Sequence, residues 1–192
     1  MKKYLMTALV LVASASLFTA SAASKKKNVK KVTPVVLASE GDSLSYAAGV
    51  YATRGLVPFI QPNAVTVVNF WFTTCNPCVG ELAELDALNK ELAEKGGSLI
   101  GVNTFTLDGD EAAISEAKDV LAKKGATYQN VYFDSDGEAG KFTTNIFAYP
   151  TTYVVDRSGN IVGEPIVGAI TEKKQAETLQ KLIEQALAAD VG

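Results

Sequence analysis

Cys75 and Cys78 are the only cysteines in this chain of 192 residues, and they are spaced C-x-x-C. A run of apolar, β-favouring residues precedes the pair, and a leucine-rich helical pattern follows it at once. A C-x-x-C pair beside alternating strands and helices is typical of thiol–disulfide exchange, in which a thiolate attacks a disulfide and the second cysteine resolves the mixed disulfide. We therefore place the chemistry of this protein at these two residues.

Other uses of a cysteine pair fit the sequence less well. A zinc site needs about four nitrogen or sulfur ligands, and the chain has two cysteines and no histidine. Covalent haem attachment requires C-x-x-C-H, whereas Val79 follows Cys78. A purely structural disulfide is the main alternative, but a cross-link that closes so short a loop stabilises little. We therefore favour a redox pair that uses no metal and no cofactor.

The position of the pair assigns a different part to each cysteine. Cys75 falls just before or in the first turn of the leucine-rich helix, where unpaired N–H groups and the helix dipole lower a thiol pKa. Cys78 lies one turn inward, so we expect it to be more buried and to act as the resolving thiol. Pro77 suits the first turn, where a missing N–H costs little.

The apolar periodicity predicts an α/β chain in the order β-α-β-α-β-α-β-β-α. Such alternation favours parallel strands with helices on both faces, and the last two strands should add an antiparallel edge through a tight turn at 156–160. The predicted strands are 64–72, 98–105, 130–133, 151–155 and 161–167, and the predicted helices run from the cysteine pair to Lys95 and over 110–124, 138–146 and 171–189.

The N-terminal part has the layout of an export signal. Basic residues at 2–3, an apolar stretch over 5–12 and an A-x-A site at 20–22 predict a secretory signal peptide over residues 1–22. We expect it to be cleaved, which places the protein in the periplasm or at the extracytoplasmic face, with an uncleaved membrane anchor as the alternative.

Residues 23–62 are predicted to be a lysine-rich tether followed by a leader helix. The helical pattern over 39–61 weakly resembles the N-terminal segment of exported FKBP-type prolyl isomerases, but no isomerase domain follows it. Residues 32–192 carry 11 basic and 21 acidic side chains, which argues against a nucleic-acid partner. Membrane contact is expected only through the signal peptide or the tether.

Two motifs in the right order resemble the exported TlpA/ResA-like thioredoxins. The stretch 69–78 with Glu81 is similar to their pattern NFWAxWCxPCxxE, and 149–162 is similar to PTTFLIDxxGxIV. The resemblance covers about residues 63–190. It implies a thioredoxin fold over residues 63–192, with a central mixed sheet flanked by helices.

The resemblance also implies roles for individual residues. Pro150 matches the family's cis-proline, and the backbones of Tyr149 and Thr151 would then face an extended substrate segment. Glu81 matches a carboxylate that serves Cys78 as acid or base, with an exposed glutamate near the helix start as the alternative. Asn76, Pro77 and Trp71 are also expected at the substrate surface. Trp71 would fill the core, shield the cysteine pair, or do both.

Several positions depart from the family pattern. Thr74 replaces a tryptophan before the first cysteine, and Val79 replaces a frequent basic residue after the second. Asn69 stands where thioredoxins keep a buried aspartate, so proton transfer is not expected from that position. The first two changes alter the surface that a partner would contact.

The sequence therefore predicts an exported thiol–disulfide oxidoreductase, as a reductase rather than an oxidant. Its partners would be protein or small-molecule disulfides and an upstream electron donor. A peroxiredoxin-type peroxidase would need T-x-x-C, and Phe72 stands at that threonine's position. Two alternatives come from other classes of protein. One is a copper-binding module, although such modules on this fold use C-x-x-x-C and a distant histidine. The other is a non-enzymatic docking protein that acts through residues 39–61.

Overall fold

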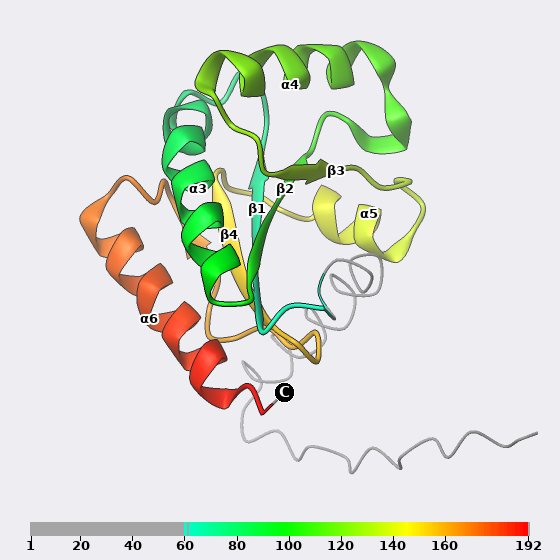
Figure 1. The fold of residues 1–192 in the computed structure, drawn as a ribbon. Helices are drawn as coiled ribbons and strands as arrows, with labels where there is room; N and C mark the ends of the chain where they lie inside the picture. Colours follow the sequence, from blue (N-terminus) through cyan, green and yellow to red (C-terminus); the bar gives the residue numbers. More distant parts are fainter. Residues whose placement is uncertain (1–59, 61, 192) are drawn as a thin grey trace, which may run out of the picture. The chain divides into compact units, whose positions relative to one another are not determined.

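The computed structural model describes residue 60 and residues 62–191 (Figure 1). The predicted signal peptide, the tether and almost all of the leader helix lie outside the described residues. The strands are β1 (Val65–Trp71), β2 (Ser98–Asn103), β3 (Gln129–Val131), β4 (Thr151–Asp156) and β5 (Ile166–Val167). The helices are α3 (Asn76–Glu94), the short 3-10 helix η1 (Leu107–Gly109), α4 (Glu111–Lys124), α5 (Glu138–Thr144) and α6 (Lys173–Ala189).

The five strands form one mixed sheet in the order β3-β2-β1-β4-β5. Strand β1 is parallel to β2, and β2 is parallel to β3, whereas β4 runs antiparallel to β1 and β5 runs antiparallel to β4. The sequence suggested antiparallel pairing only at the edge of the sheet. In the structure the central strand β1 also has an antiparallel neighbour, β4. The element order and the mixed sheet flanked by helices are as predicted.

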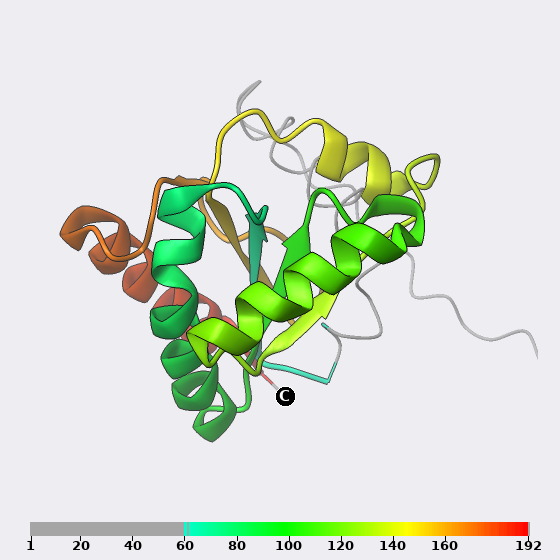
Figure 2. The same ribbon diagram turned by 90° about the horizontal axis from the view of Figure 1, so that it is seen from above.

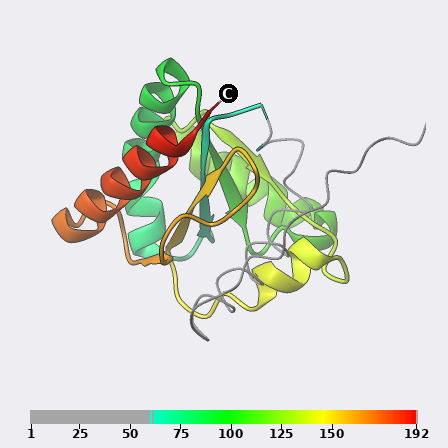
Figure 3. The ribbon, with the colours of Figure 1, turned by 90° about the horizontal axis from the view of Figure 1, so that it is seen from below.

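Helices cover both faces of the sheet (Figure 2). Helices α3 and α6 lie on one face, where they share a hydrophobic cluster with β1 and receive apolar side chains of α4. Helix α5 lies on the opposite face, where Phe142 packs against a second cluster that includes Phe70. The view from below shows the same arrangement, with α6 beside α3 and α5 across the sheet (Figure 3).

Strand β1 is buried on both faces, and this is why its sequence is almost continuously apolar. All seven of its residues are buried. Because successive side chains point to opposite faces of a sheet, Val67 and Trp71 join the cluster under α3 and α6, while Val68 and Phe70 join the cluster under α5. Asn69 is the polar exception within this run, and it lies at the site described below.

The final hairpin is shorter than the sequence predicted. The turn forms as expected, because Asp156 N donates to Asn160 O at 2.9 Å. Ile161, however, makes only an isolated bridge to Val155, and regular pairing resumes at β5. Pro165 lacks the N–H that a continuous strand would use, and Gly163 adopts a left-handed conformation with φ of 71°, so the intervening chain bulges away from β4.

Three other predicted elements have shifted or earlier ends. Strand β2 ends at Asn103, because the Asn103 side-chain oxygen accepts a hydrogen bond from Phe105 N at 2.9 Å and turns the chain. Strand β3 begins and ends slightly earlier than predicted, and α5 ends at Thr144. These shifts leave the elements around the cysteine pair unchanged.

Candidate active site

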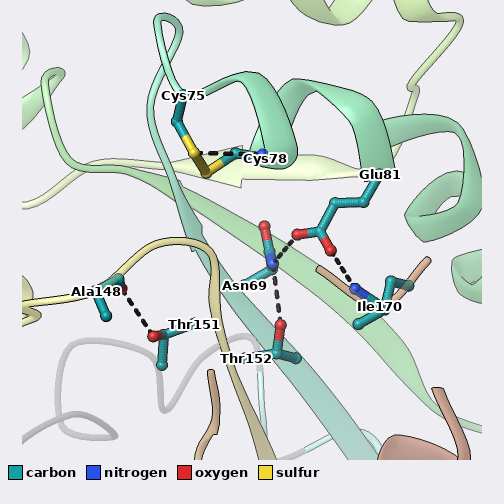
Figure 4. Close-up of a disulfide and its surroundings, with 8 residues drawn as sticks. All are labelled: Asn69, Cys75, Cys78, Glu81, Ala148, Thr151, Thr152 and Ile170. Atoms are coloured by element: carbon teal, nitrogen blue, oxygen red, sulfur yellow. Dashed lines mark hydrogen bonds between the residues drawn. A yellow bond between two sulfur atoms is a disulfide. The ribbon is translucent and has the colours of Figure 1, made fainter. Parts of the chain in front are cut away.

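The two cysteines form a disulfide at the N-terminus of α3 (Figure 4). Cys75 is the N-cap residue, and its Sγ accepts a hydrogen bond from Cys78 N at 3.3 Å. Pro77 is the second residue of the helix, where its missing N–H breaks no helical hydrogen bond. The Cα atoms of the pair lie 5.2 Å apart, so one turn of helix brings both sulfurs together.

The two sulfur atoms differ in their access to solvent. Cys75 is 7% exposed and Cys78 is 0% exposed, while the intervening Asn76 and Pro77 are exposed. Only Cys75 can therefore be reached by a partner while the helix stays folded. Its position at the helix N-terminus also favours the thiolate, because the N–H groups and the dipole of α3 stabilise negative charge there.

Glu81 lies one turn after Cys78 and faces the interior of the domain. Its side chain is 0% exposed, so the alternative of an exposed glutamate near the helix start is wrong. The carboxylate accepts hydrogen bonds from Asn69 Nδ2 at 2.9 Å and from Ile170 N at 2.6 Å. Burial raises the pKa of Glu81 to about 7, against the lowering effect of these two donors, and the charge of Glu84 adds to the rise.

Asn69 connects Glu81 to the strand on the other side of β1. Its Nδ2 donates to Glu81 Oε1 and, at 3.0 Å, to Thr152 Oγ1 of β4. Its Oδ1 is buried and has no hydrogen-bond partner among the described residues. Figure 4 shows Nδ2 on the side of Glu81 and Thr152 and Oδ1 on the side of the cysteine pair.

The loop before β4 carries the second sequence motif. The Tyr149–Pro150 peptide bond is cis, and Thr151 Oγ1 donates to Ala148 O at 2.8 Å within the loop. Gly168 N donates to Pro150 O at 2.9 Å, which fixes the loop to the segment after β5. Pro150 and Thr151 are buried and Tyr149 is half-buried, so Tyr149 is the one of these three residues whose side chain reaches the surface.

Three aromatic side chains form a surface beside the cysteine pair, which we call the aromatic cluster: Phe72, Phe105 and Tyr149. The ring of Phe72 lies 4.9 Å from that of Phe105 and 5.1 Å from that of Tyr149, measured between centroids. Phe105 is 51% exposed. Because Phe72 precedes Cys75 by only three residues, the cluster joins the Pro150 loop to the segment that enters α3.

Trp71 lies beneath the pair and not on this surface. It is 0% exposed and shares the first hydrophobic cluster with Cys75 and Cys78. Its Nε1 donates to Asn130 Oδ1 of β3 at 2.9 Å. The core-filling role is therefore correct, whereas a buried side chain offers no contact to a substrate, so the expected place of Trp71 at the substrate surface is corrected.

The structure thus brings together Cys75, Cys78, Glu81 and the Pro150 loop, as the two motifs implied. Sequence reasoning missed the hydrogen-bonding role of Asn69, its partner Thr152 and the exposed ring of Phe105. The signal for Asn69 was available, because a polar residue in the middle of a strand buried on both faces needs partners. Phe105 lies shortly after the end of β2, and no sequence pattern predicts that its ring is exposed.

The described residues contain no group of three or more histidine, cysteine, aspartate or glutamate side chains placed to hold a metal ion. No helix within the described range combines the length and the apolar character needed to cross a membrane.

Comparison with known proteins places this fold and site in a family. The model of the Redoxin family matches residues 59–182, more than half of the chain. The chain belongs to the Redoxin family. The thioredoxin fold that the sequence predicted is confirmed.

Among curated proteins, the chain is 29% identical over 113 residues to the thioredoxin-like protein YneN of Bacillus subtilis, covering 59% of this chain and 62% of YneN. It is 31% identical over 115 residues to the thiol-disulfide oxidoreductase ResA of Bacillus thuringiensis, covering 60% of this chain and 61% of ResA. The chain thus matches about three fifths of the length of these relatives, and the predicted resemblance to the ResA-like thioredoxins is confirmed.

Among solved structures, a Chlorobium tepidum protein described as a thiol:disulfide interchange protein of the DsbE type superposes with a TM-score of 0.55. It is 24% identical and covers 68% of this chain and 84% of that chain. This likeness supports the fold.

Proposed function

We propose that this protein is a thiol–disulfide oxidoreductase that reduces disulfides through Cys75 and Cys78. The observation that carries the proposal is the disulfide at the N-terminus of α3 with the buried carboxyl of Glu81 one turn behind it. The names of the curated relatives ResA and YneN agree with this chemistry.

The proposed reaction proceeds in two exchange steps. The Cys75 thiolate attacks one sulfur of the substrate disulfide, which forms a mixed disulfide and releases the other substrate sulfur as a thiolate. Cys78 then loses its proton to the Glu81 carboxylate and attacks Cys75 Sγ. This closes the Cys75–Cys78 disulfide and releases the second substrate thiolate, so two electrons pass from the protein to the substrate. An upstream electron donor of the dithiol class restores the reduced pair.

Glu81 suits the part of proton acceptor because its pKa is raised to about 7 by burial. A general base works best when its pKa lies near the working pH. At neutral pH the ionised and protonated forms of Glu81 are both populated, so the carboxyl can take the proton of Cys78 and later return it to solvent.

We further propose that the substrates are protein disulfides with apolar flanks. The aromatic cluster offers exposed apolar surface beside Cys75, and large exposed aromatic rings are a common feature of protein-binding surfaces. Asn76 and Pro77 form the exposed rim next to the reactive sulfur. The backbones of Tyr149 and Thr151 are proposed to contact the substrate chain that carries the disulfide.

We also propose export to an extracytoplasmic compartment, supported by the signal-like residues 1–22. In this arrangement the lysine-rich segment and leader over 23–62 connect the export signal to a thioredoxin-like domain over 63–192. The family match begins at residue 59, four residues before this proposed boundary.

The test is the reduction of a disulfide-bonded peptide by the chemically reduced full chain, followed as thiols that appear on the peptide after it has been separated from the protein. The wild-type protein is expected to release two thiols for each protein molecule, and Cys75→Ser to release none. An undiminished rate in Cys75→Ser would exclude the proposed attack by this residue. Thr66→Val, a buried change on β1 away from the pair, controls for effects on folding.

A further inference from the structure

Only one of the two polar atoms of the Asn69 side-chain amide makes hydrogen bonds. Nδ2 donates to Glu81 Oε1 and to Thr152 Oγ1, whereas the buried Oδ1 has no partner among the described residues. A buried acceptor without a donor is unfavourable, so such an atom in a folded protein calls for an explanation. The structure contains the oxidised pair, and a disulfide carries no proton that could fill this position.

The direction of Oδ1 relates this unused acceptor to the cysteine pair. Figure 4 shows Oδ1 on the side of the amide that faces the cysteine pair. Reduction of the disulfide gives Cys78 a thiol proton, and a thiol is a weak hydrogen-bond donor. The reduced state therefore offers a donor on Cys78 that the oxidised state lacks.

We propose that Asn69 is a positioning residue for Cys78, and that its side-chain amide rotates by half a turn during the reaction. While Glu81 is ionised, Oδ1 accepts a hydrogen bond from the Cys78 thiol and Nδ2 donates a hydrogen bond to Glu81. Rotation of the amide breaks its bonds to the thiol and to Glu81 Oε1, the Cys78 proton passes to the freed Oε1, and Nδ2 then faces the Cys78 thiolate. This inference rests on the proposed function, because it describes the resolving step of that exchange.

Both orientations of the amide find partners for its polar atoms. Thr152 can accept from Nδ2 or donate to Oδ1, because a hydroxyl is both donor and acceptor. Glu81 accepts from Nδ2 when ionised and donates to Oδ1 when protonated. The N–H of Ile170 stays on Oε2 at 2.6 Å, which leaves Oε1, the oxygen facing Asn69, for the proton.

The resolving step transfers one proton from Cys78 to Glu81 and exchanges one disulfide bond for another. The Cys78 thiol and the Glu81 carboxylate become a thiolate and a carboxylic acid, so the total charge of the site does not change. The thiolate then attacks Cys75 Sγ of the mixed disulfide, and the substrate sulfur leaves as a thiolate. In the rotated state Nδ2 donates to the Cys78 thiolate, and a hydrogen bond to the charged form lowers the pKa of a group.

The other ionisable groups near Glu81 set the background for this exchange. The charge of Glu84, on the same helix, adds to the raised pKa of Glu81. The buried Tyr128 hydroxyl has a pKa raised above its ordinary value by burial and by the charges of Glu81 and Asp86, so it stays protonated. Asp86 is paired with Lys90 at 2.7 Å. Glu81 is thus the carboxyl of this site whose pKa lies near neutral pH.

The first test measures the pKa of Cys78 by the ultraviolet absorbance of its thiolate in the full chain carrying Cys75→Ser. Asn69→Leu, which has a similar shape and no polar atom, is expected to raise the Cys78 pKa by roughly one unit, because the lost hydrogen bond to the thiolate is stronger than the lost hydrogen bond to the thiol. The same rise is expected when Glu81→Gln is also present. A Cys78 pKa that Asn69→Leu leaves unchanged in the Glu81→Gln background would overturn the direct contact.

Thr66→Val is the matched control for this experiment, because Thr66 is also fully buried on β1 and its Oγ1 has no partner among the described residues. It is expected to leave the Cys78 pKa unchanged. An equal rise in Thr66→Val would attribute the effect to a general change of the strand and would contradict the proposal.

The second test needs no substitution at the site. Nuclear magnetic resonance of the Asn69 side-chain amide is compared between the oxidised and the reduced wild-type chain across pH. The reduced protein is expected to show a shift of this amide that follows the Cys78 titration and is absent from the oxidised protein. Identical pH curves in the two states would overturn the rotation. Because turnover of peptide disulfides is measured separately, normal turnover with identical curves would reject this inference alone.

Discussion

Asn69 Nδ2 of β1 and Glu81 Oε1 of α3 lie 2.9 Å apart in the interior of the domain. This hydrogen bond joins the strand that precedes the cysteine pair to the helix that follows it. The donors to the carboxylate are the backbone N–H of Ile170 and the neutral amide of Asn69. Neither is a cation, so burial is only partly offset and the pKa of Glu81 rises to about 7. The site therefore contains a carboxyl group that can be protonated under mild conditions.

The buried carboxyl makes stability depend on pH. Glu81 binds its proton more tightly in the folded protein, with a pKa of about 7 against a model value of 4.5. Between these values the folded state binds more protons than the unfolded state, so stability falls as pH rises through this window. We expect the oxidised wild-type protein to lose about 3 kcal/mol of unfolding free energy from this group between pH 4.5 and 7.

Denaturant unfolding of the oxidised protein at several pH values measures this effect. Glu81→Gln keeps the shape of the side chain and cannot ionise, so its stability should stay nearly flat across the same window. A wild-type curve that parallels that of Glu81→Gln would contradict the raised pKa. Asp86, whose pKa is lowered to about 2 by its hydrogen bonds to Lys90 and Thr127, acts in the opposite direction and only at more acidic pH.

The same carboxyl should shape the pH profile of turnover. Protonated Glu81 cannot accept the Cys78 proton, so the turnover rate with a peptide disulfide should fall as pH drops below about 7. Glu81→Gln should slow the resolving step by roughly 10²- to 10⁴-fold, the range for loss of a general base, and should remove this acid limb. Steady-state rates across pH measure both effects.

Glu84→Gln is the matched control for turnover, because Glu84 is an exposed residue of the same helix. It should retain the acid limb and move it to slightly lower pH, since the Glu84 charge contributes to the raised pKa of Glu81. An acid limb that persists unchanged in Glu81→Gln would assign the titration to another group.

The aromatic cluster should distinguish protein substrates from small disulfides. Phe105→Ser removes the exposed ring that packs 4.9 Å from Phe72. It should lower kcat/KM for a peptide disulfide with apolar flanks by roughly 10- to 100-fold, as expected when an aromatic side chain no longer buries its surface. Reduction of a small hydrophilic disulfide should continue at the wild-type rate.

Tyr132→Ser controls for the loss of an exposed aromatic ring elsewhere on the surface, because Tyr132 is 50% exposed and is not a member of the aromatic cluster. It should leave both substrates unaffected. Equal losses for the peptide and the small disulfide in Phe105→Ser would point to a distorted cysteine pair and would reject the docking role.

Much of the fold could be predicted because its strongest signals are local. The apolar run of β1 and the leucine spacing of α3 each follow from burial, and the glycine after α4 has a φ of 68°, as a left-handed helix end requires. The direction of β4 was harder to predict. Its antiparallel pairing with β1 depends on how the chain passes from β3 through α5, and the hydrophobic pattern of a strand does not contain that information.

In the candidate site, too, local relationships could be predicted from the sequence and long-range contacts could not. Cys75, Cys78 and Glu81 lie within two turns of one helix, so their spacing in the sequence predicts their proximity. The contact between Asn69 and Thr152 spans 83 positions, and the sequence gives no register for it. For Trp71, proximity in the sequence was misleading. Its place near the cysteines suggested a role at the surface, whereas its side chain lies in the core and donates a hydrogen bond to Asn130.

In the proposed exchange Cys75 attacks the substrate disulfide and Cys78 resolves the mixed disulfide. The most direct test is the intact mass of the reduced Cys78→Ala protein after mixing with a disulfide-bonded peptide. We expect a stable increase in mass by one peptide half, located on Cys75 and removed by a thiol reductant. The wild-type protein should return to its own disulfide without an adduct. A Cys78→Ala protein that forms no adduct with the peptide would contradict the account.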